Sequence, residues 1–413
     1  MDKKNKNPNV PNLRFNHFTD PWHNYQVSEL LTTFSTNSLS WDQLTYDKES
    51  PLKNLHYGLI HNAFNVTCIH GKSHLLPYIN QSSIPTKYTL IQNGDLILAD
   101  ASEDRKDVGR PVEMIDIDNQ QIISGLHTIH ARNKTDLIVN GFKGFYFQSE
   151  AMKKQLFKVA NGSKIYGISS SNFNNLSMSI PDSQEQRKIV DMMIKIEDRI
   201  LTQSKIINDY IILKNWINNM INSELKCQYL DFSSIYKIAK EGGTPSTSNP
   251  SYYFGEIPFI KIEDLTKKYI TSNKTFISKD GLKNSSTWII PKNSIILSNG
   301  ATIGNVSINT YPVATKQGIL GVVPKEEVLT EYLFYLLNTD DFKRKIRQIT
   351  TKGTIDCAYI KDINHIKVKI PDIQIQKKIT QILASFDSKI ELENTILNSL
   401  KEEKQYLLKN LFI

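Results

Sequence analysis

Apolar residues along this chain follow two spacings, and the pair of spacings occurs twice. In residues 176–180 and again in 366–370, apolar and polar residues alternate, which is typical of a strand. After each stretch, apolar residues recur every three or four positions as a heptad seam, which indicates long helices that pair as a coiled coil. We expect this seam to consist of Ile189, Met193, Ile196, Ile200 and Ile207 in the first copy and Ile379, Leu383, Phe386, Ile390 and Leu397 in the second.

The two copies are related by a fixed offset of 190 residues, as from Ile180 to Ile370, and this offset holds without a gap to residue 413. Each copy opens with Pro-Asp, where the proline ends the strand and the aspartate can cap the first helical amides. In the first copy Glu185 follows Asp182 by three residues, as in a capping box. Polar residues interrupt both seams at equivalent positions, and such residues fix the register of a coiled coil. They are Gln203 and Lys214 in one copy and Glu393 and Lys404 in the other.

This pattern predicts an α+β protein in which two globular domains alternate with two long helices. The expected parts are a first domain at 1–180 that starts with a flexible arm at 1–12, a central helix at 181–222, a second domain at 223–370 and a C-terminal helix at 371–413. If the helices pair antiparallel, a pseudo-twofold axis can relate the two halves.

Charge and cysteine usage narrow the class of protein. The formal net charge is +8, and the excess of Lys and Arg lies in 1–180 and 223–370, whereas the helical segments are neutral overall. This distribution favours a polyanionic partner. Three widely spaced cysteines, the lack of an apolar run of about 20 residues and the lack of a secretion signal predict a cytoplasmic protein outside the membrane.

Local motifs in the second half resemble a known family. They are Gly242-Gly243-Thr244-Pro245-Ser246 followed by the aromatic run at 252–254 and Ile257-Pro258-Phe259-Ile260, the strand and glycine loop at 294–304, the strand at 314–319, and the P-x-x-x-x-Q-(R/K)-K-I helix openings. Together they resemble the target-recognition domains and helices of type I restriction-modification DNA-specificity subunits. The first half lacks the Gly-Gly-Thr-Pro opening, although Asn93–Asp100 is similar in character to Asn293–Asn299.

The resemblance implies two mixed α/β recognition domains that each grip a few base pairs, joined by two antiparallel helices that set the distance between half-sites. Because the halves diverge, the target is expected to be asymmetric and bipartite. The expected partners are double-stranded DNA, two methylation subunits and restriction-motor subunits. S-adenosylmethionine, ATP and Mg²⁺ are expected on those partners, so the chain is a non-catalytic component of a site-specific deoxyribonuclease and adenine methyltransferase complex.

Candidate DNA contacts follow from the chemistry of base and phosphate recognition, in which Arg, Lys, Asn and Gln read base edges and cations or hydroxyls hold phosphates. In the first half the candidates are His56, Tyr57, Arg105, Lys106, Arg110 and His127. In the second half they are Thr244, Ser246, Thr247, Lys261, Asn299, Thr302, Lys316, Gln317 and Lys352.

Other readings of the sequence have less support. Asn249–Tyr252 is similar to the N-P-P-Y motif of amino-methyltransferases, but no F-x-G-x-G cofactor loop precedes it. Asp182 with Glu185 is faintly like a nuclease motif, yet it opens a helix, and Cys68, His70 and His74 lack a fourth ligand for zinc. No P-loop is present. A two-domain coiled-coil scaffold that does not read DNA remains the alternative.

Overall fold

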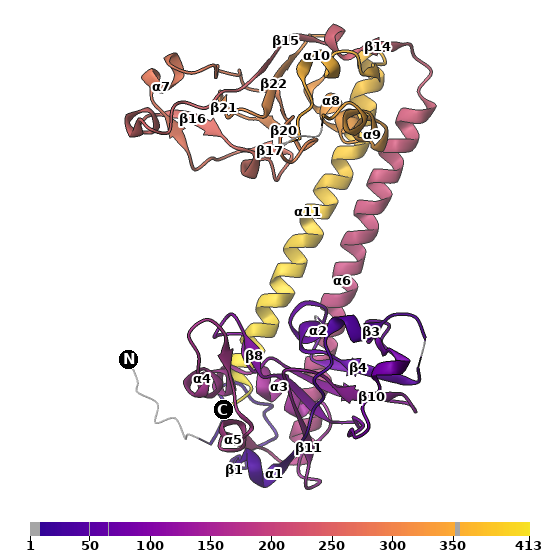
Figure 1. Cartoon of the computed structure of the whole chain (residues 1–413), viewed down its shortest axis with the longest axis vertical. Helices are drawn as coiled ribbons and strands as arrows, with labels where there is room; N and C mark the ends of the chain where they lie inside the picture. The colour runs from indigo at the N-terminus through magenta and orange to yellow at the C-terminus, as the bar shows by residue number, and fades with distance from the viewer. Residues whose placement is uncertain (1–8, 49, 65, 352–355) are drawn as a thin grey trace. The chain divides into compact units, whose positions relative to one another are not determined.

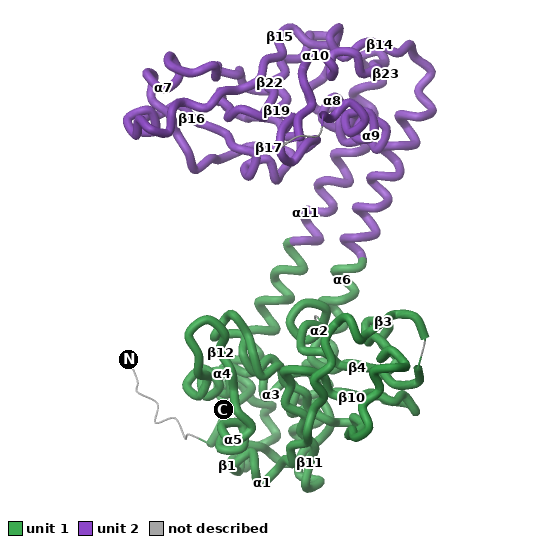
Figure 2. The backbone as a smooth tube through the Cα atoms, viewed as in Figure 1, with its two compact units in different colours: residues 1–205, 395–413 green, residues 206–394 purple. Residues whose placement is uncertain are grey.

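The computed structural model describes residues 9–48, 50–64, 66–351 and 356–413. The chain forms two compact units, and each contains one globular part together with one end of each long helix (Figure 2). Unit 1 comprises residues 1–205 and 395–413, and unit 2 comprises residues 206–394. The long helices are α6 (Ser183–Glu224) and α11 (Ile373–Asn410) (Figure 1).

Unit 1 contains a five-stranded mixed sheet in the order β2-β11-β7-β9-β5, with a smaller sheet in the order β10-β4-β6-β3. The five strands are Leu31–Phe34, Thr128–Asn133, Leu96–Ala99, Pro111–Ile115 and Cys68–His70, and the four are Gln121–Ser124, Leu52–Leu55, Tyr78–Ile79 and Leu44–Thr45. Two short pairs join β1 (His23–Gln26) to β13 (Ser177–Ile180) and β8 (Ala101–Ser102) to β12 (Tyr166–Gly167). The helices are α1 (Val27–Leu30), α2 (Tyr57–Asn62), α3 (Phe142–Gln148), α4 (Glu150–Val159) and α5 (Ser170–Asn174), with 3₁₀ turns at Trp41–Gln43 and Gln81–Ser83.

Unit 2 has a five-stranded mixed sheet in the order β15-β22-β19-β20-β17 and a smaller sheet in the order β18-β16-β21. These strands are Tyr236–Glu241, Ile319–Pro324, Ile295–Ser298, Val306–Asn309 and Tyr269–Ile270, then Phe276–Ile277, Ile257–Ile260 and Ala314–Thr315. A further pair joins β14 (Tyr229–Asp231) to β23 (Lys367–Lys369). The helices are α7 (Lys279–Lys283), α8 (Thr330–Leu337), α9 (Asp340–Gln348) and α10 (Ile360–Ile363), with 3₁₀ turns η3 (Phe232–Ser234), η4 (Pro250–Tyr253) and η5 (Ile262–Asp264).

The two units repeat one topology. In both five-stranded sheets the last strand pairs in parallel with its neighbour, β5 with β9 and β17 with β20, while the other pairings are antiparallel. In both smaller sheets one parallel pair recurs, β4 with β10 and β16 with β21. The central strands β7 and β19 are buried along their whole length, which explains why their sequences are runs of apolar residues rather than alternating ones. The α+β prediction with two long helices is therefore confirmed.

Both long helices begin as the sequence predicts. The Asp182 Oδ1 atom accepts hydrogen bonds from the backbone amides of Gln184 (2.7 Å) and Glu185 (3.0 Å), and Asp372 caps α11 in the same way. The predicted capping box at Glu185 is wrong, because the Arg14 guanidinium donates two hydrogen bonds, of 2.8 and 2.7 Å, to the Glu185 carboxylate. This ion pair ties the start of the chain to α6.

The start of the chain also bears on the flexible arm predicted for residues 1–12. Residues 1–8 lie outside the described residues. The Asn9 carbonyl accepts a hydrogen bond from the Trp22 amide, and the Leu13 amide donates to the Asn410 carbonyl. The described end of this segment therefore contacts the rest of unit 1.

The seam between the helices is seen separately in each unit. Ile189, Met193, Ile196, Ile200 and Ile207 on α6, and Ile379, Leu383 and Leu397 on α11, are buried, whereas Phe386 and Ile390 are half-buried. The predicted seam breaks at Lys214 and Lys404 form ion pairs across the seam. Lys404 contacts Glu197 at 2.6 Å in unit 1, and Lys214 contacts Asp387 at 2.7 Å in unit 2. The lysines are 190 residues apart and so are the carboxylates, so one pairing occurs twice between helices that run in opposite directions.

Candidate nucleic-acid interface

In unit 2 the loops that follow several strands meet at one edge of the sheets. The Gly242 amide after β15 donates to the Ile319 carbonyl (2.8 Å), and the Asn299 amide after β19 donates to the Gly318 carbonyl (3.0 Å). The Lys316 amide donates to the Ile260 carbonyl at the end of β16 (3.0 Å). These bonds bring together four segments that are far apart in the sequence.

Most of the residues that the sequence singles out in unit 2 lie at this edge. Lys261 is half-buried, and the exposed ones are Thr244, Ser246, Thr247, Thr302, Lys316 and Gln317. The Gly-Gly opening has a steric reason, since a Cβ atom at Gly242 would lie 2.2 Å from the Thr315 carbonyl oxygen. The edge therefore presents cations, an amide and hydroxyl groups, which are the groups that contact base edges and phosphates.

Asn299 is not at the surface of this edge, contrary to the expectation from sequence. Its side chain is fully buried, and its Nδ2 atom donates to the Ala358 carbonyl at 3.2 Å. The residue therefore ties the loop after β19 to the segment before α10 and cannot reach DNA without leaving that position. Lys352, another candidate, lies outside the described residues.

Unit 1 presents the equivalent edge. The Asp100 amide after β7 donates to the His127 carbonyl (3.0 Å), and the Gly125 amide after β10 donates to the Leu55 carbonyl at the end of β4 (2.9 Å). The His127 side chain is 52% exposed, with its Nδ1 atom 3.5 Å from an Asp100 carboxylate oxygen. His127 is therefore available to a ligand at this edge.

His56 proves to be a structural residue. It is buried, its ring lies 4.7 Å from the Trp41 ring, and its Nδ1 atom accepts a hydrogen bond from the Gly58 amide to cap α2. Burial lowers the pKa of His56, and the nearby His127 lowers it further. The neutral imidazole is therefore favoured, and only the neighbouring Tyr57, half-buried and edge-on to His127 at 5.4 Å, remains near the surface.

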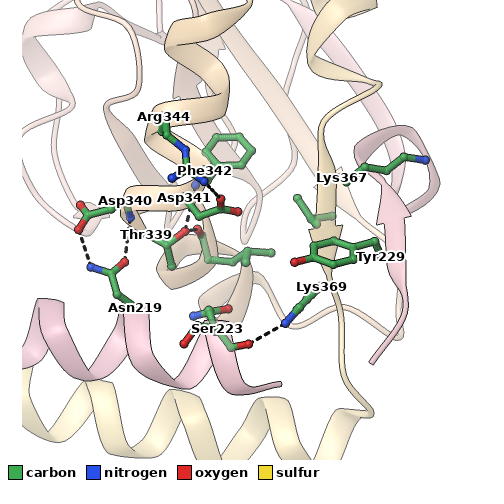
Figure 3. Close-up of a pocket in the computed structure, with 13 residues that line it drawn as sticks. Asn219, Ser223, Tyr229, Thr339, Asp340, Asp341, Phe342, Arg344, Lys367 and Lys369 are labelled. Atoms are coloured by element: carbon green, nitrogen blue, oxygen red, sulfur yellow. Dashed lines mark hydrogen bonds and ion pairs between the residues drawn. The ribbon is translucent and has the colours of Figure 1, made fainter. Parts of the chain in front are cut away.

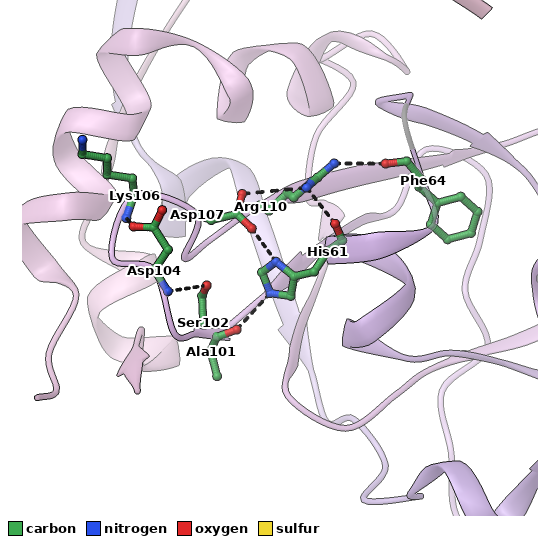
Figure 4. Close-up of polar contacts among 8 residues, drawn as sticks. All are labelled: His61, Phe64, Ala101, Ser102, Asp104, Lys106, Asp107 and Arg110. Atoms are coloured by element: carbon green, nitrogen blue, oxygen red, sulfur yellow. Dashed lines mark hydrogen bonds and ion pairs between the residues drawn. The ribbon is translucent and has the colours of Figure 1, made fainter. Parts of the chain in front are cut away.

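The charged loop between β8 and β9 is held in place by its own arginines. The Arg110 guanidinium donates to the carbonyls of His61 (2.9 Å) and Phe64 (3.1 Å), as Figure 4 shows. Arg105 donates to the Ala160 carbonyl at 3.3 Å and stacks over the Phe157 ring at 4.3 Å. The sequence predicts direct DNA contacts for both arginines, whereas their contacts within the chain shape the loop, and Lys106 remains exposed.

His61 couples this loop to pH. Its Nδ1 atom lies 2.6 Å from an Asp107 carboxylate oxygen and its Nε2 atom 3.0 Å from the Ala101 carbonyl (Figure 4). The hydrogen bond with Asp107 raises the pKa of His61, with a smaller contribution from Ala101, while burial and the Arg110 charge oppose this. A raised pKa means that the folded loop binds the proton more tightly than the unfolded chain does.

We therefore expect His61 to stabilise the loop fully below its ordinary pKa of about 6.5, and to lose this contribution as pH rises through the higher pKa of the folded state. Because Asp107 is partly exposed, the effect should not exceed about 1 kcal/mol. Hydrogen exchange of the loop amides between pH 5.5 and 8.5 measures it. His61→Gln should abolish the pH dependence, and an unchanged dependence in that variant would assign it to another group.

A separate pocket of about 400 Å³ in unit 2 lies between α6, α9 and β23 (Figure 3). Its polar groups bond with one another. Asn219 donates to Asp340 at 2.7 Å, Arg344 to Asp341 at 2.6 Å, and Lys369 to the Ser223 carbonyl at 2.9 Å. These contacts anchor α9 and β23 to α6, which is a structural role.

The residues that suggested catalysis or metal binding have local roles. The Asn249 side chain accepts hydrogen bonds from the Ser251 amide and hydroxyl, so it caps η4. Cys68 is buried, and His70 is exposed and lies 3.1 Å from Asp116. Within 9–48, 50–64, 66–351 and 356–413, no three His, Cys, Asp or Glu side chains are grouped so that they could hold a metal ion. No described helix is both long and apolar enough to cross a bilayer.

The glutamine of each helix opening has a role that sequence reasoning missed. The Gln186 side chain accepts a hydrogen bond from the Val139 amide and donates to the Leu137 carbonyl, both at 2.8 Å. Gln376 makes the same two bonds to Leu329 and Glu327. The partners are also 190 residues apart, so this glutamine docks each globular part onto its helix, and the offset itself was the signal that could have revealed it.

Comparison with known proteins adds an independent result. Residues 79–209 and 228–402 match the family described as the type I restriction modification DNA specificity domain. The chain is 34% identical over 178 residues to the MjaIX specificity subunit of Methanocaldococcus jannaschii, a match that covers 42% of this chain and 40% of that protein. It is 29% identical over 177 residues to the EcoR124I/EcoR124II specificity subunit of Escherichia coli, covering 40% and 43%. The chain thus spans about two fifths of the length of these relatives.

Among solved structures, the fold resembles that of a type I restriction-modification S subunit from M. genitalium. The TM-score is 0.52 at 15% identity, and the likeness covers 98% of this chain and 99% of that one. A second structure, from work on assembly and conformational transition of the type I R-M system, gives a TM-score of 0.63 at 14% identity over 94% and 96% of the two chains.

Proposed function

Because the chain belongs to the family of type I restriction-modification DNA specificity domains, we propose that it reads the DNA target for such a system. Each unit reads one half of a split target. The observation that carries this proposal is the repeated loop edge, since two units of one topology present equivalent loops with different side chains. Different side chains at equivalent positions select different bases, so the target is asymmetric.

The chemistry of the two edges supports base reading. Unit 2 offers Lys316 and Gln317, which suit guanine and adenine respectively, and threonine and serine hydroxyls beside them. Unit 1 offers Lys106, His127 and Tyr57. The chain itself contributes recognition and no catalytic group, and S-adenosylmethionine, ATP and Mg²⁺ act on the partner subunits.

Selection of bound duplexes from a random pool by the full chain with its methylation partner tests the proposal. We expect two short sequences separated by a gap without base preference. Replacing Lys316 and Gln317 with alanine should relax one of them by about 1–3 kcal/mol per lost contact and leave the other unchanged. Lys106→Ala with His127→Ala should relax the opposite one, and Lys158→Ala, an exposed change on α4, should relax neither. A chain that binds no DNA at all would be a scaffold.

The helices provide a surface for protein partners. Ile212, Trp216 and Met220 follow one stripe of α6 at a spacing of four residues, and they are 66%, 58% and 41% exposed. Apolar side chains aligned on one helical face favour contact with an apolar face of another protein. We propose that methylation subunits, two for each chain, dock on the helices and that restriction-motor subunits join this assembly.

A further inference from the structure

Each unit has a pocket beside its loop edge, and the two pockets occupy equivalent positions in the repeated topology. The unit 1 pocket has a volume of about 180 Å³ and lies between the glycine turn that leads into β9, the corner between α3 and α4, and α11. The unit 2 pocket has a volume of about 510 Å³ and lies between the glycine turn that leads into β20 and the corner between α8 and α9.

The repeat relates the walls of the two pockets residue by residue. Gln148, Lys153 and Leu156 line the first pocket, and the residues 190 positions later, Asn338, Lys343 and Ile346, line the second. Gly109 and Gly304 make the turn in each wall with φ angles of +78° and +95°, a conformation that favours glycine. The chain therefore contains the same pocket twice.

Both pockets are lined by cations. The first has Lys106, Arg110, Lys153 and Lys404, with Asp107 as its one lining carboxylate among the described residues. The second has Lys267, Lys268, Lys343 and Arg347, and no described carboxylate lines it. Apart from Lys153 and Lys343, these cations stand at positions that the repeat does not relate. The positive charge is thus present in both pockets although the residues that supply it differ.

Several of these cations have no anionic partner within the chain. The described residues provide neither a hydrogen bond nor an ion pair for the ammonium groups of Lys106, Lys153, Lys267 and Lys343. In contrast, Lys404 pairs with Glu197, and Lys268 lies 3.6 Å from Asp387. Unpaired ammonium groups held near other cations repel one another, and a bound anion relieves that repulsion.

We propose that the two pockets each bind a phosphate group of the DNA backbone next to the half-site that the same unit reads. This inference rests on the proposed function. The pockets adjoin the reading edges, since Thr302 and Lys106 lie within two and four residues of Gly304 and Arg110. Phosphate contacts from lysine and arginine fix the position of a protein on the duplex without selecting bases, so they can recur unchanged in units that read different sequences.

The experiment measures binding of the full chain with its methylation partner to a target duplex and to a duplex of random sequence over a range of salt concentrations. Lys153→Ala and Lys343→Ala should each lower the slope of log K against log salt by about one, and the double variant by about two. Affinity for both duplexes should fall by the same factor. Lys158→Ala on α4 and Lys292→Ala before β19 are exposed controls, and both should keep the wild-type slope.

The possible outcomes separate the two proposals. Variants that melt normally and bind DNA with the wild-type slope overturn the phosphate pockets and leave target reading intact. A relaxed preference at one half-site would show that the pocket lysines read bases, which also overturns the inference. Weakened assembly with the methylation partner at an unchanged slope would assign the pockets to an acidic protein surface. A wild-type complex that binds neither duplex contradicts the proposed function itself.

Discussion

Replacing Glu197 with alanine is expected to destabilise unit 1 by about 3–5 kcal/mol, because it leaves a buried ammonium group without its carboxylate. Glu197 is 3% exposed, and it accepts the Lys404 ammonium at 2.6 Å together with the amide and hydroxyl of Thr67 at 2.6 to 3.0 Å. One side chain on α6 thus holds both α11 and the segment before β5. Hydrogen exchange of the β5 and α3 amides, which belong to unit 1, measures the loss.

The repeat supplies the control for this experiment. Asp387 is the equivalent carboxylate in unit 2, where it accepts Lys214 at 2.7 Å and the Tyr335 hydroxyl at 2.6 Å. Its side chain is 28% exposed, so water compensates part of what alanine removes, and Asp387→Ala should cost less than Glu197→Ala. Glu403→Ala, at an exposed site on α11, should cost almost nothing. Equal losses at Glu197 and Asp387 would contradict the argument from burial.

Lys143→Met should also destabilise unit 1 by about 3–5 kcal/mol. Lys143 and Glu113 are fully buried and lie 2.9 Å apart, and Glu113 also accepts the amides of Gly141 and Gly144 at 2.6 and 2.8 Å. Removal of the ammonium group leaves the carboxylate in an apolar interior with only the two amides. Unfolding of the variant, followed by hydrogen exchange of the β9 and α3 amides, gives the magnitude.

Unit 2 shows what can stand in place of this buried pair. The equivalent positions are Ile308 on β20 and Leu333 on α8, and both are buried. The double variant Glu113→Ile with Lys143→Leu should therefore recover part of the loss, since apolar residues often replace a buried ion pair without cost. Recovery should be incomplete because the amides of Gly141 and Gly144 lose their acceptor. A double variant less stable than Lys143→Met would contradict this expectation.

The sequence predicts the repeated, helix-based features well because they depend on local spacing. Asp182 and Asp372 cap their helices, the heptad positions around Met193 and Leu383 are buried, and the seam lysines form one ion pair in each unit. Each of these depends on residues within one or two helical turns, or on an offset that can be read directly from the chain.

The loop residues are harder to predict because their surroundings come from distant segments. Asn299 is buried by the segment around Ala358, His56 by Trp41, and Arg110 is engaged by the carbonyl of Phe64. Nothing in the local sequence distinguishes such a residue from one that faces a ligand. The pocket lysines Lys153 and Lys343 are the opposite case, since the offset of 190 relates them, but their neighbouring cations come from loops that differ between the halves.

The composition of unit 1 from two separated segments sets an order of events during translation. Residues 395–413 leave the ribosome only after all of unit 2, and at about 5–20 residues per second that delay is roughly 10–40 seconds. Phe412 packs on Phe142 and Tyr146, and the Ile413 carbonyl accepts the Tyr146 hydroxyl, so these aromatic side chains lack their partners throughout that interval. The nascent chain therefore carries an unfinished apolar surface while unit 2 is being synthesised, and in that interval it is most exposed to aggregation and to chaperone binding.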